Sequence, residues 1–198
     1  SQFTGSVWQR VGGGDGFECI YDEVDQNVRY TSLYYGRVYR SSSDYENQQI
    51  CGLDVLGITE EGAWSSPFLI SRYNDNHMFA GLKNVWRTMN IKDPERDSVA
   101  WERISFNLGN DNNSNLNNLE QSRANENMLW CSKGSRRLYL TTNALATVDS
   151  VEWIDLSNSL PWLSFPVSTI ETHPTDSATL YIGFNNSVYK SIDRGISW

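Results

Sequence analysis

Apolar and aromatic side chains are arranged in short clusters along this chain, and segments rich in Asn, Asp, Ser and Gly separate the clusters. Short clusters of aromatic and β-branched residues bounded by turn residues are typical of strands. The 3.6-residue period of an amphipathic helix is clearest at 115–127 (NLNNLEQSRANEN), and it is weak even there. The pattern therefore predicts an all-β chain with one helical candidate.

One pattern of strands and turns recurs four times, at 28–41, 77–88, 137–148 and 179–191. Each copy opens on an aromatic residue in an apolar strand, and a turn rich in Gly, Asn or Lys follows. Three copies then end on an apolar, an aromatic, a basic and a hydroxyl residue, at 38–41, 85–88 and 188–191. The third copy lacks this ending around 144–148. Another apolar strand precedes each copy, and a strand led by Trp follows it.

Units of about 40–50 residues with three or four antiparallel strands are typical of the blades of a β-propeller. One such sheet cannot bury both faces alone, so neighbouring units must pack around a common axis. The sequence predicts blades at 12–64, 65–106, 127–157 and 164–198, with an Asn-rich insertion at 107–126. These four blades favour part of a seven- or eight-bladed ring over a small closed propeller. Because the strand at 7–11 belongs to a preceding blade, we expect a fragment of a larger chain.

The last eight residues, SIDRGISW at 191–198, resemble the Asp-box (BNR repeat) of the sialidase-like, sortilin-like and xyloglucanase-like propellers. The segments YRSSSD at 39–44 and VWRTMN at 85–90 resemble degenerate copies of this box. The resemblance implies that Ser191 and Asp193 bond the turn backbone, that Gly195 has a positive φ, and that Trp198 packs between blades. It also implies a structural role for the box, on the face away from the ligand site.

Two other segments, 12–23 and 64–88, resemble inner strands of large secreted bacterial proteins, many of them from the Bacteroidetes. This resemblance implies a protein that is secreted or held on the bacterial outer-membrane surface, with the cell surface or the secretion machinery as a partner. Three short motifs, DSV, DSV and DSA, are similar to the O-glycosylation acceptor of such proteins. They predict modification of Ser98, Ser150 and Ser177, and coincidence is the competing explanation.

Charge and cysteine content exclude several classes of function. Sixteen basic and 24 acidic residues give a net charge of −8, which repels phosphate backbones and argues against nucleic acid as a partner. Cys19, Cys51 and Cys131 lack a C-x-x-C spacing, which argues against a zinc site. Two alternatives remain open for them: one disulfide with a free thiol, or three buried thiols.

No metal or cofactor site is predicted. The Asn-rich stretch at 110–118 has the residue types of a calcium loop, but Ser122 stands where an EF-hand loop needs a bidentate Glu, so a solvated loop is favoured. The two histidines, His77 and His173, are interpreted as solvated turn residues.

The residues that enter each innermost strand are the candidate ligand-binding positions, because such entries line the channel mouth of a propeller. They include Asp15, Trp64, Trp130 and Trp162. Aromatic rings stack on sugar faces, and acidic groups bond sugar hydroxyls, so these residues favour glycan binding. The alternatives are that the tryptophans pack between blades and that Asp15 forms a turn.

No catalytic residue is predicted. The chain lacks the Arg-Ile-Pro motif usual in sialidases, since Arg103-Ile104 is followed by Ser105, and it contains no G-x-S-x-G, H-E-x-x-H or phosphate-binding loop. The acidic clusters at 22–25 and 171–176 are expected at hairpin turns on the side away from the ligand, so no carboxylate pair is expected at the channel mouth. The sequence thus predicts a non-catalytic module that recognises a glycan or a protein. The alternative is a glycoside hydrolase whose carboxylates lie partly outside this chain.

Overall fold

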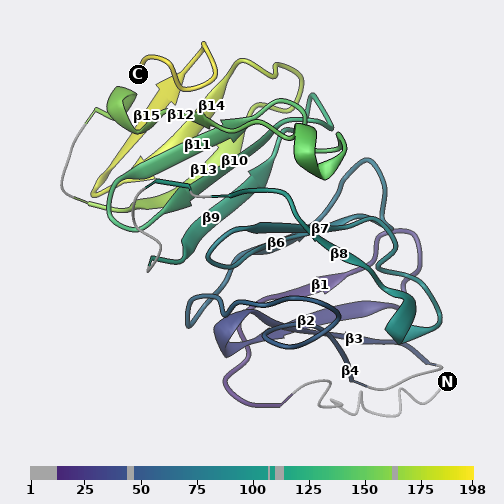
Figure 1. Ribbon diagram of the computed structural model, residues 1–198. Helices are drawn as coiled ribbons and strands as arrows, with labels where there is room; N and C mark the ends of the chain where they lie inside the picture. The colour runs from purple at the N-terminus through teal and green to yellow at the C-terminus, as the bar shows by residue number, and fades with distance from the viewer. Residues whose placement is uncertain (1–12, 44–46, 107, 110–113, 162–164) are drawn as a thin grey trace, which may run out of the picture.

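The computed structural model describes residues 13–43, 47–106, 108–109, 114–161 and 165–198, and their strands form four antiparallel sheets (Figure 1). The first sheet contains β1 (Cys19–Tyr21), β2 (Arg29–Leu33), β3 (Arg37–Ser41) and β4 (Gln48–Cys51), and the second contains β5 (Phe68–Ile70), β6 (Met78–Gly81), β7 (Val85–Thr88) and β8 (Trp101–Arg103). The third contains β9 (Leu116–Gln121), β10 (Leu129–Lys133), β11 (Arg137–Thr141) and β12 (Ile154–Asp155), and the fourth contains β13 (Val167–Thr172), β14 (Leu180–Phe184) and β15 (Ser187–Ser191).

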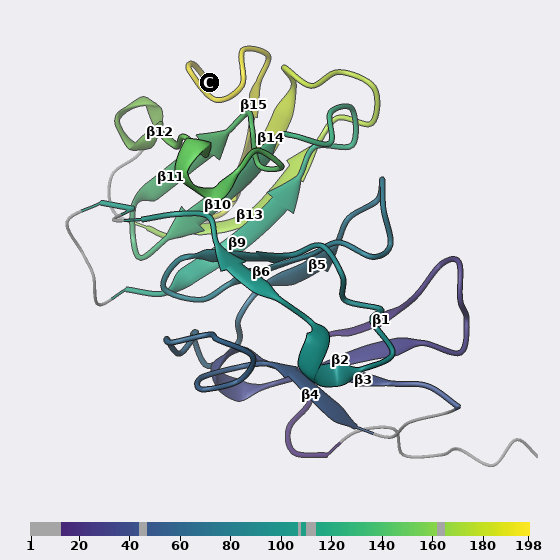
Figure 2. The ribbon, with the colours of Figure 1, turned by 45° about the vertical axis from the view of Figure 1, so that its right-hand side comes forward.

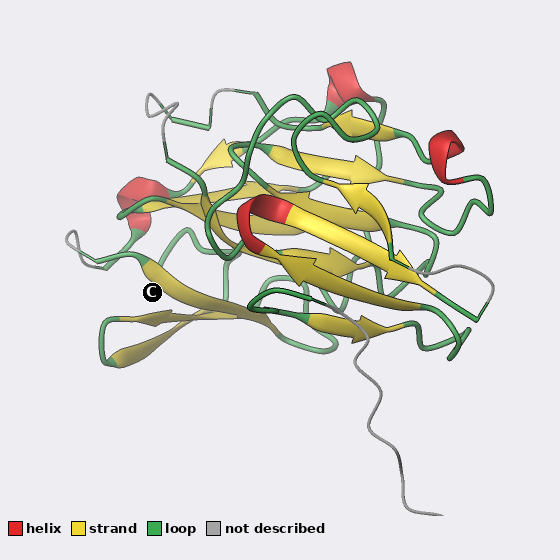
Figure 3. Cartoon of the chain, turned by 90° about the horizontal axis from the view of Figure 1, so that it is seen from below, coloured by secondary structure: helices red, strands yellow, loops and turns green. Residues whose placement is uncertain are grey.

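The described residues contain no α-helix, which confirms the predicted all-β class. The helical segments are the 3-10 turns η1 (Tyr34–Gly36), η2 (Arg96–Ser98), η3 (Val148–Ser150) and η4 (Ser157–Ser159), which lie at the ends of the sheets (Figure 3). None of the helical segments within the described ranges is long and apolar enough to cross a lipid bilayer.

Each sheet is a meander in which the strands keep their chain order, because short turns join antiparallel neighbours. The first strands of the sheets, β1, β5, β9 and β13, therefore occupy equivalent edges. Strand β9 contacts both β5 and β13, so these edges meet in the middle of the molecule (Figure 2). This arrangement places the first strands around one common space.

Hydrophobic clusters fill the spaces between successive sheets, and strand alternation supplies both sides of each sheet. In β6, the buried Met78 and Ala80 pack toward the first sheet, whereas the buried Phe79 between them packs toward the third. A further cluster, which includes Trp130 and Ile182, joins the third and fourth sheets. The two-sided burial explains why β6, β7 and β10 are buried at every position.

Strand β9 lies within the segment predicted as an insertion, and it overlaps the helical candidate at 115–127. Its apolar residues, Leu116 and Leu119, are three positions apart, which resembles helical spacing. The pairing with β10 shifts between Ser132 and Lys133, so that Asn117 is the extra residue of a β-bulge. The bulge brings both leucines to the buried side of a strand. The insertion and the helix are therefore wrong at 116–121, and the third sheet begins there.

The strand assignments after β9 change accordingly. The segment at 127–136, predicted as a first strand, contains the second strand β10, and β11 is the third strand of its sheet. The repeated ending is present in β11 as Leu138, Tyr139, Leu140 and Thr141, with Leu140 at the position of the basic residue. The ending of the third copy is therefore not lost; it lies at 138–141 and not around 144–148.

A shared hydrogen-bond arrangement follows the third strand in three of the sheets. A hydroxyl residue at the strand end bonds an Asn or Asp two positions later, in the pairs Thr88–Asn90 (3.1 Å), Thr141–Asn143 (2.9 Å) and Ser191–Asp193 (2.7 Å). The Oδ1 atom of each Asn or Asp then accepts from the backbone N–H just before a tryptophan, at Ala100 (3.0 Å), Glu152 (3.0 Å) and Ser197 (2.8 Å). This small network fixes the position of the tryptophan relative to the end of the third strand.

The tryptophans at these positions join neighbouring sheets. The indole Nε1–H of Trp101 donates to the carbonyl of Ile50 in β4, and that of Trp153 donates to the carbonyl of Ile104, each at 2.7 Å. Trp198 packs against the cluster between the third and fourth sheets. In the turn before it, Gly195 has a φ of +93°, and its N–H donates to Ser191 Oγ at 2.8 Å. Membership of the Asp-box family stays a prediction.

The basic residue of the repeated ending also joins neighbouring sheets. Arg40 in β3 donates to the carbonyls of Ile91 (2.5 Å) and Asp93 (2.7 Å), in the turn that follows β7. Arg87 in β7 makes the equivalent bonds to the turn that follows β11. In the first two copies, the basic residue of the repeated ending therefore joins its sheet to the next one.

Asp193→Ala is expected to lower the thermal midpoint of unfolding at pH 7, because it removes the acceptor for two bonds from Ser197. Hydrogen bonds from Ser197 and Ser191 lower the pKa of Asp193 from 3.8 to about 2. A lowered folded-state pKa stabilises the protein above the unfolded pKa, and this stabilisation is lost as the pH falls toward 2. The difference between wild type and variant, followed by circular dichroism from pH 7 to pH 3, should therefore shrink at the acidic end. Asp193→Asn is the control, because it introduces the residue type that occupies the equivalent positions Asn90 and Asn143. A pH-independent difference would contradict this account.

All three cysteines are free thiols; Cys51 and Cys131 are buried and Cys19 is exposed. Neither alternative from the sequence, one disulfide with a free thiol or three buried thiols, matches this in full.

The histidines lie in first hairpin turns: His77 lies 3.2 Å from the amide of Asn74, and His173 accepts from the N–H of Thr175 at 3.3 Å. Within the described ranges, no three His, Cys, Asp or Glu side chains are grouped to hold a metal ion.

Candidate ligand-binding site

Four aromatic side chains gather where the first sheet meets the connection to the second, and we call them the aromatic platform: Phe17, Tyr34, Tyr35 and Trp64. The rings of Tyr34 and Trp64 are stacked, with centroids 5.2 Å apart and planes 15° apart. Phe17 and Tyr35 meet Trp64 edge-on at 6.1 Å and 5.4 Å. Trp64 nevertheless keeps 51% of its surface exposed to solvent.

The backbone holds this platform rigid. Tyr35 has a φ of +64°, a conformation that non-glycine residues rarely adopt, and its N–H and carbonyl bond the connection at Ala63 (3.0 Å) and Gly62 (3.3 Å). Gly62 allows this close approach, since a Cβ there would lie 2.1 Å from Ser66 Oγ. A strained residue fixed on both sides keeps the rings in one geometry.

The aromatic platform has the chemistry of a sugar-binding surface. Flat, exposed rings offer a π-face to the apolar face of a pyranose, and rigid aromatic side chains lose little entropy on binding. The guanidinium of Arg37 lies over Tyr34, 5.1 Å from the ring centroid, and supplies a hydrogen-bond donor beside the rings. Stacking surfaces with adjacent polar groups are suited to carbohydrate hydroxyls.

The four predicted ligand positions have different environments. Trp64 belongs to the aromatic platform. Asp15 is exposed in the turn before β1, between Gly14 and Gly16, which both have positive φ. Trp130 is the second residue of β10 and is fully buried, and its indole donates to the carbonyl of Arg194 at 3.4 Å, so it has no surface to offer a ligand. Its placement at the channel mouth was wrong because β9, and not β10, is the first strand of its sheet. Trp162 lies outside the described residues.

Sequence reasoning missed the other platform residues. Tyr34 and Tyr35 are adjacent aromatics immediately before Gly36 in the turn between β2 and β3, and an aromatic pair in a hairpin turn is a candidate for binding because loops often carry function. That pair is the signal that was available. The position of Phe17 against Trp64 depends on the contact between two sheets and has no local signature.

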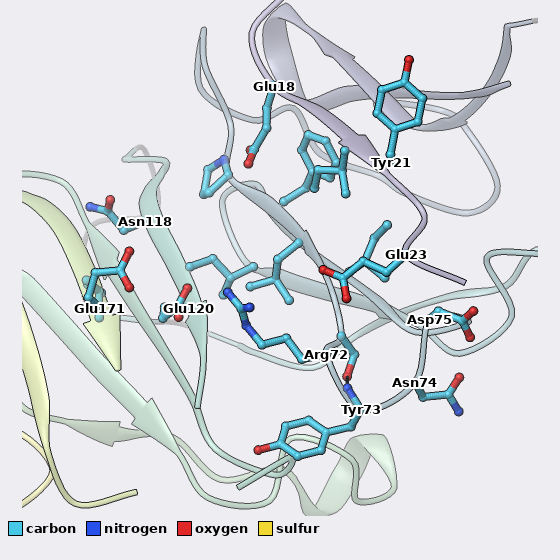
Figure 4. A pocket seen from close by; sticks show the side chains of 18 of the residues that line it. Glu18, Tyr21, Glu23, Arg72, Tyr73, Asn74, Asp75, Asn118, Glu120 and Glu171 are labelled. Carbon is cyan, nitrogen blue, oxygen red and sulfur yellow. Dashed lines mark hydrogen bonds between the residues drawn. The ribbon is translucent and has the colours of Figure 1, made fainter. Parts of the chain in front are cut away.

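A cavity of about 590 Å³ lies in the space that the first strands surround (Figure 4). Its wall comes from β1, β5, β9 and β13 and from the turns after β1 and β5. The acidic side chains in the wall are Glu18, Glu23, Asp75, Glu120 and Glu171. Arg72 reaches from the turn after β5 toward Glu120 (Figure 4).

Two of these carboxyl groups, Glu120 in β9 and Glu171 in β13, influence each other. Burial raises the pKa of Glu120 to about 7, and the negative charge of Glu171 adds to the shift, whereas Arg72 and Arg123 oppose it. Glu171 is bound by Arg123 at 3.1 Å, and Thr172 Oγ1 lies 3.4 Å from Glu120 Oε1. The arrangement combines a carboxyl group whose pKa is raised toward neutral pH with a second carboxyl group that an arginine binds.

This pair lies in the cavity wall beside the first hairpin turns and not at the strand entries. The sequence prediction concerned only the channel mouth, and it placed Glu171 beside the hairpin turns, where it lies. Glu120 was missed because its strand was interpreted as an insertion. A six-residue strand such as β13 spans about 20 Å, so the pair and the entries of the first strands are well separated.

No family model matches this chain, and no curated protein matches it. Solved structures do. The chain is similar to an ancestral GH74 enzyme, with a TM-score of 0.66 and 16% identity over 98% of this chain and 25% of that one. It is also similar to the GH74 xyloglucanase from Xanthomonas campestris, with a TM-score of 0.57 and 14% identity over 97% of this chain and 31% of that one.

These structures are β-propeller enzymes. The chain shares their fold. At identities this low the likeness concerns the fold alone, and the chain spans about a quarter to a third of the length of these two proteins.

The predicted number of blades and their closure into a ring stay predictions, as does the modification of Ser98, Ser150 and Ser177. The first two serines lie in η2 and η3 and the third in the turn before β14, so all three are in turns.

Proposed function

We propose that this chain is a propeller segment that recognises a neutral glycan through the aromatic platform, without cleaving it. The observation that carries the proposal is the exposed Trp64 ring, held by Tyr34, Tyr35 and Phe17 at the entry to the first strand of the second sheet. Xyloglucan is the first ligand to test, because one structural neighbour is a xyloglucanase. The protein would act outside the cell or on its surface, where such polysaccharides occur.

The platform favours binding for an energetic reason. Exposing a large aromatic surface costs free energy in water, and a sugar ring that covers it recovers part of that cost. Backbone bonds fix the rings before the ligand arrives, so little conformational entropy is lost on association. The platform is therefore preorganised for stacking.

Glycoside hydrolysis is the second candidate, and the Glu120–Glu171 pair favours it. A carboxyl group with a raised pKa is suited to be a general acid, and a neighbouring Glu is suited to be the second carboxylate. Against this role, Arg123 already engages Glu171, and the pair lies away from the strand entries that carry Trp64. We therefore place recognition first.

Trp64→Ala is expected to weaken binding to xyloglucan about tenfold, because it removes the central stacking surface. Affinity gel electrophoresis with soluble xyloglucan measures the effect. Phe106→Ala is the matched control, since Phe106 has the same 51% exposure and lies outside the aromatic platform. Equal retardation of the two variants would contradict the proposal.

The hydrolase candidate has its own test. Incubation of the chain with xyloglucan, followed by a reducing-end assay, is expected to release no sugar. Release that disappears in Glu120→Gln but persists in Trp64→Ala would favour hydrolysis at the Glu120–Glu171 pair instead.

A further inference from the structure

A second cavity, of about 370 Å³, lies beside the turn between β10 and β11. Three basic residues, Lys133, Arg136 and Arg137, contribute to its wall, together with the polar side chains of Ser135, Ser157 and Asn158. Its volume is at the lower end of the range of about 300–1,000 Å³ for ligand pockets, so it suits one sugar residue better than several.

The charge of this cavity is opposite to that of the whole protein. The net charge of the chain is −8, yet the wall carries three cationic side chains. Arg137 approaches Asp155 only to 3.7 Å, longer than the roughly 2.7–2.9 Å of a charge-assisted hydrogen bond. Neither a hydrogen bond nor an ion pair joins Arg136 to another residue in the described ranges. Arg136 therefore contributes to the wall a guanidinium that no described residue pairs.

The walls of the cavity are fixed by backbone contacts. Gly134 forms the turn with a φ of +57°, and its carbonyl accepts from the amide of Asn117 at 2.6 Å. On the other side, Ser157 Oγ accepts from the N–H of Leu138 at 3.3 Å, and the N–H of Ser157 donates to Asp155 at 2.8 Å. The site is held in shape before any ligand binds.

The cavity lies on the same face of the molecule as the aromatic platform. The turn between β10 and β11 is equivalent to the turn between β2 and β3, which carries Tyr34 and Tyr35, and both turns lie toward the left in Figure 1. A glycan that binds this face therefore meets aromatic rings over the first two sheets and a basic cavity over the third.

We propose that this cavity binds the carboxylate of a uronic acid residue in an acidic glycan. The planar guanidinium of Arg136 matches a carboxylate with two parallel hydrogen bonds, and the serine and asparagine side chains suit the sugar hydroxyls. The choice of a glycan over another anion rests on the proposed function. A sulfate ester on a sugar would present similar charge, and the experiment below separates the two.

Calorimetric titrations with trigalacturonic acid, its methyl ester and a sulfated disaccharide provide the test, at one fixed ionic strength. We expect saturable binding of the acid, about tenfold weaker binding of the ester, and about tenfold weaker binding of the acid by Arg136→Gln. Lys190→Gln is the control, because it removes one positive charge from an exposed residue outside the cavity. Equal affinities for acid and ester, or equal effects of the two variants, would overturn the proposal, and binding of the sulfated sugar alone would overturn the carboxylate assignment.

These outcomes are separate from those of the aromatic platform. If Trp64→Ala leaves neutral glycan binding unchanged while Arg136→Gln weakens uronate binding about tenfold, the platform fails and the cavity stands. If the platform binds xyloglucan and no uronate binds, the cavity proposal fails alone.

Discussion

Arg87→Met will lower the free energy of unfolding by about 3 kcal/mol. The side chain is almost fully buried, and its guanidinium donates to the carbonyls of Ala144 (2.6 Å) and Ala146 (3.0 Å) and to Glu102 (2.5 Å). Methionine fills much of the same volume but leaves both carbonyls without their donor. Glu102 is half-exposed and regains water, so the loss comes mainly from the two carbonyls.

Lys190→Met is the matched control for this prediction. Lys190 occupies the same position of the repeated ending, in β15, but is exposed. Its replacement should change stability by less than about 0.5 kcal/mol. Urea unfolding of both variants, followed by tryptophan fluorescence, gives the comparison. If Arg87→Met and Lys190→Met lower the free energy of unfolding by the same amount, Arg87 does not join the sheets as described.

Glu120→Gln will raise stability at pH 8 by about 2 kcal/mol relative to wild type and leave it nearly unchanged at pH 4. The folded protein holds the pKa of Glu120 at about 7, against 4.5 for the free side chain. A carboxyl group with a raised folded-state pKa favours folding while protonated, and this advantage is lost as the pH rises from 4.5 toward 7. The shift corresponds to about 3 kcal/mol, which partial solvent contact reduces to about 2.

Glutamine keeps the shape of the protonated acid and never ionises, so the variant escapes the loss at high pH. Glu171→Gln should give a smaller gain, because it removes only the charge that adds to the shift. Urea midpoints between pH 4 and pH 8 measure both effects. A gain for Glu120→Gln that is the same at every pH would show that the fold does not raise the pKa of Glu120.

The sequence predicted the local parts of this fold well, because hairpins depend on neighbouring residues. The pattern at 77–88 gave β6 and β7, and the tryptophan at 101 gave β8, since alternation and turn residues are visible within a short window. What the pattern did not contain was the partner of each repeated basic residue. Arg87 bonds a turn 57 residues away, and no local rule points to it.

The errors have one common physical cause. The bulge in β9 interrupts strand alternation, so that Leu116 and Leu119 resemble a helical face. Once β9 was missed, Trp130 was assigned to a strand entry and Glu120 to a loop. For the candidate site, Trp64 was found from its position before a strand, whereas its partners Phe17, Tyr34 and Tyr35 meet it only through the packing of two sheets.

The most direct test of glycan recognition at the aromatic platform is the indole N–H resonance of Trp64, followed by ¹H–¹⁵N correlation spectra during titration with xyloglucan oligosaccharide. Comparison with Trp64→Phe assigns the resonance. We expect it to move saturably with ligand, while the indole resonances of the buried Trp101 and Trp130 stay in place. A saturable response elsewhere with Trp64 unmoved, or no saturable response at all, would contradict the account.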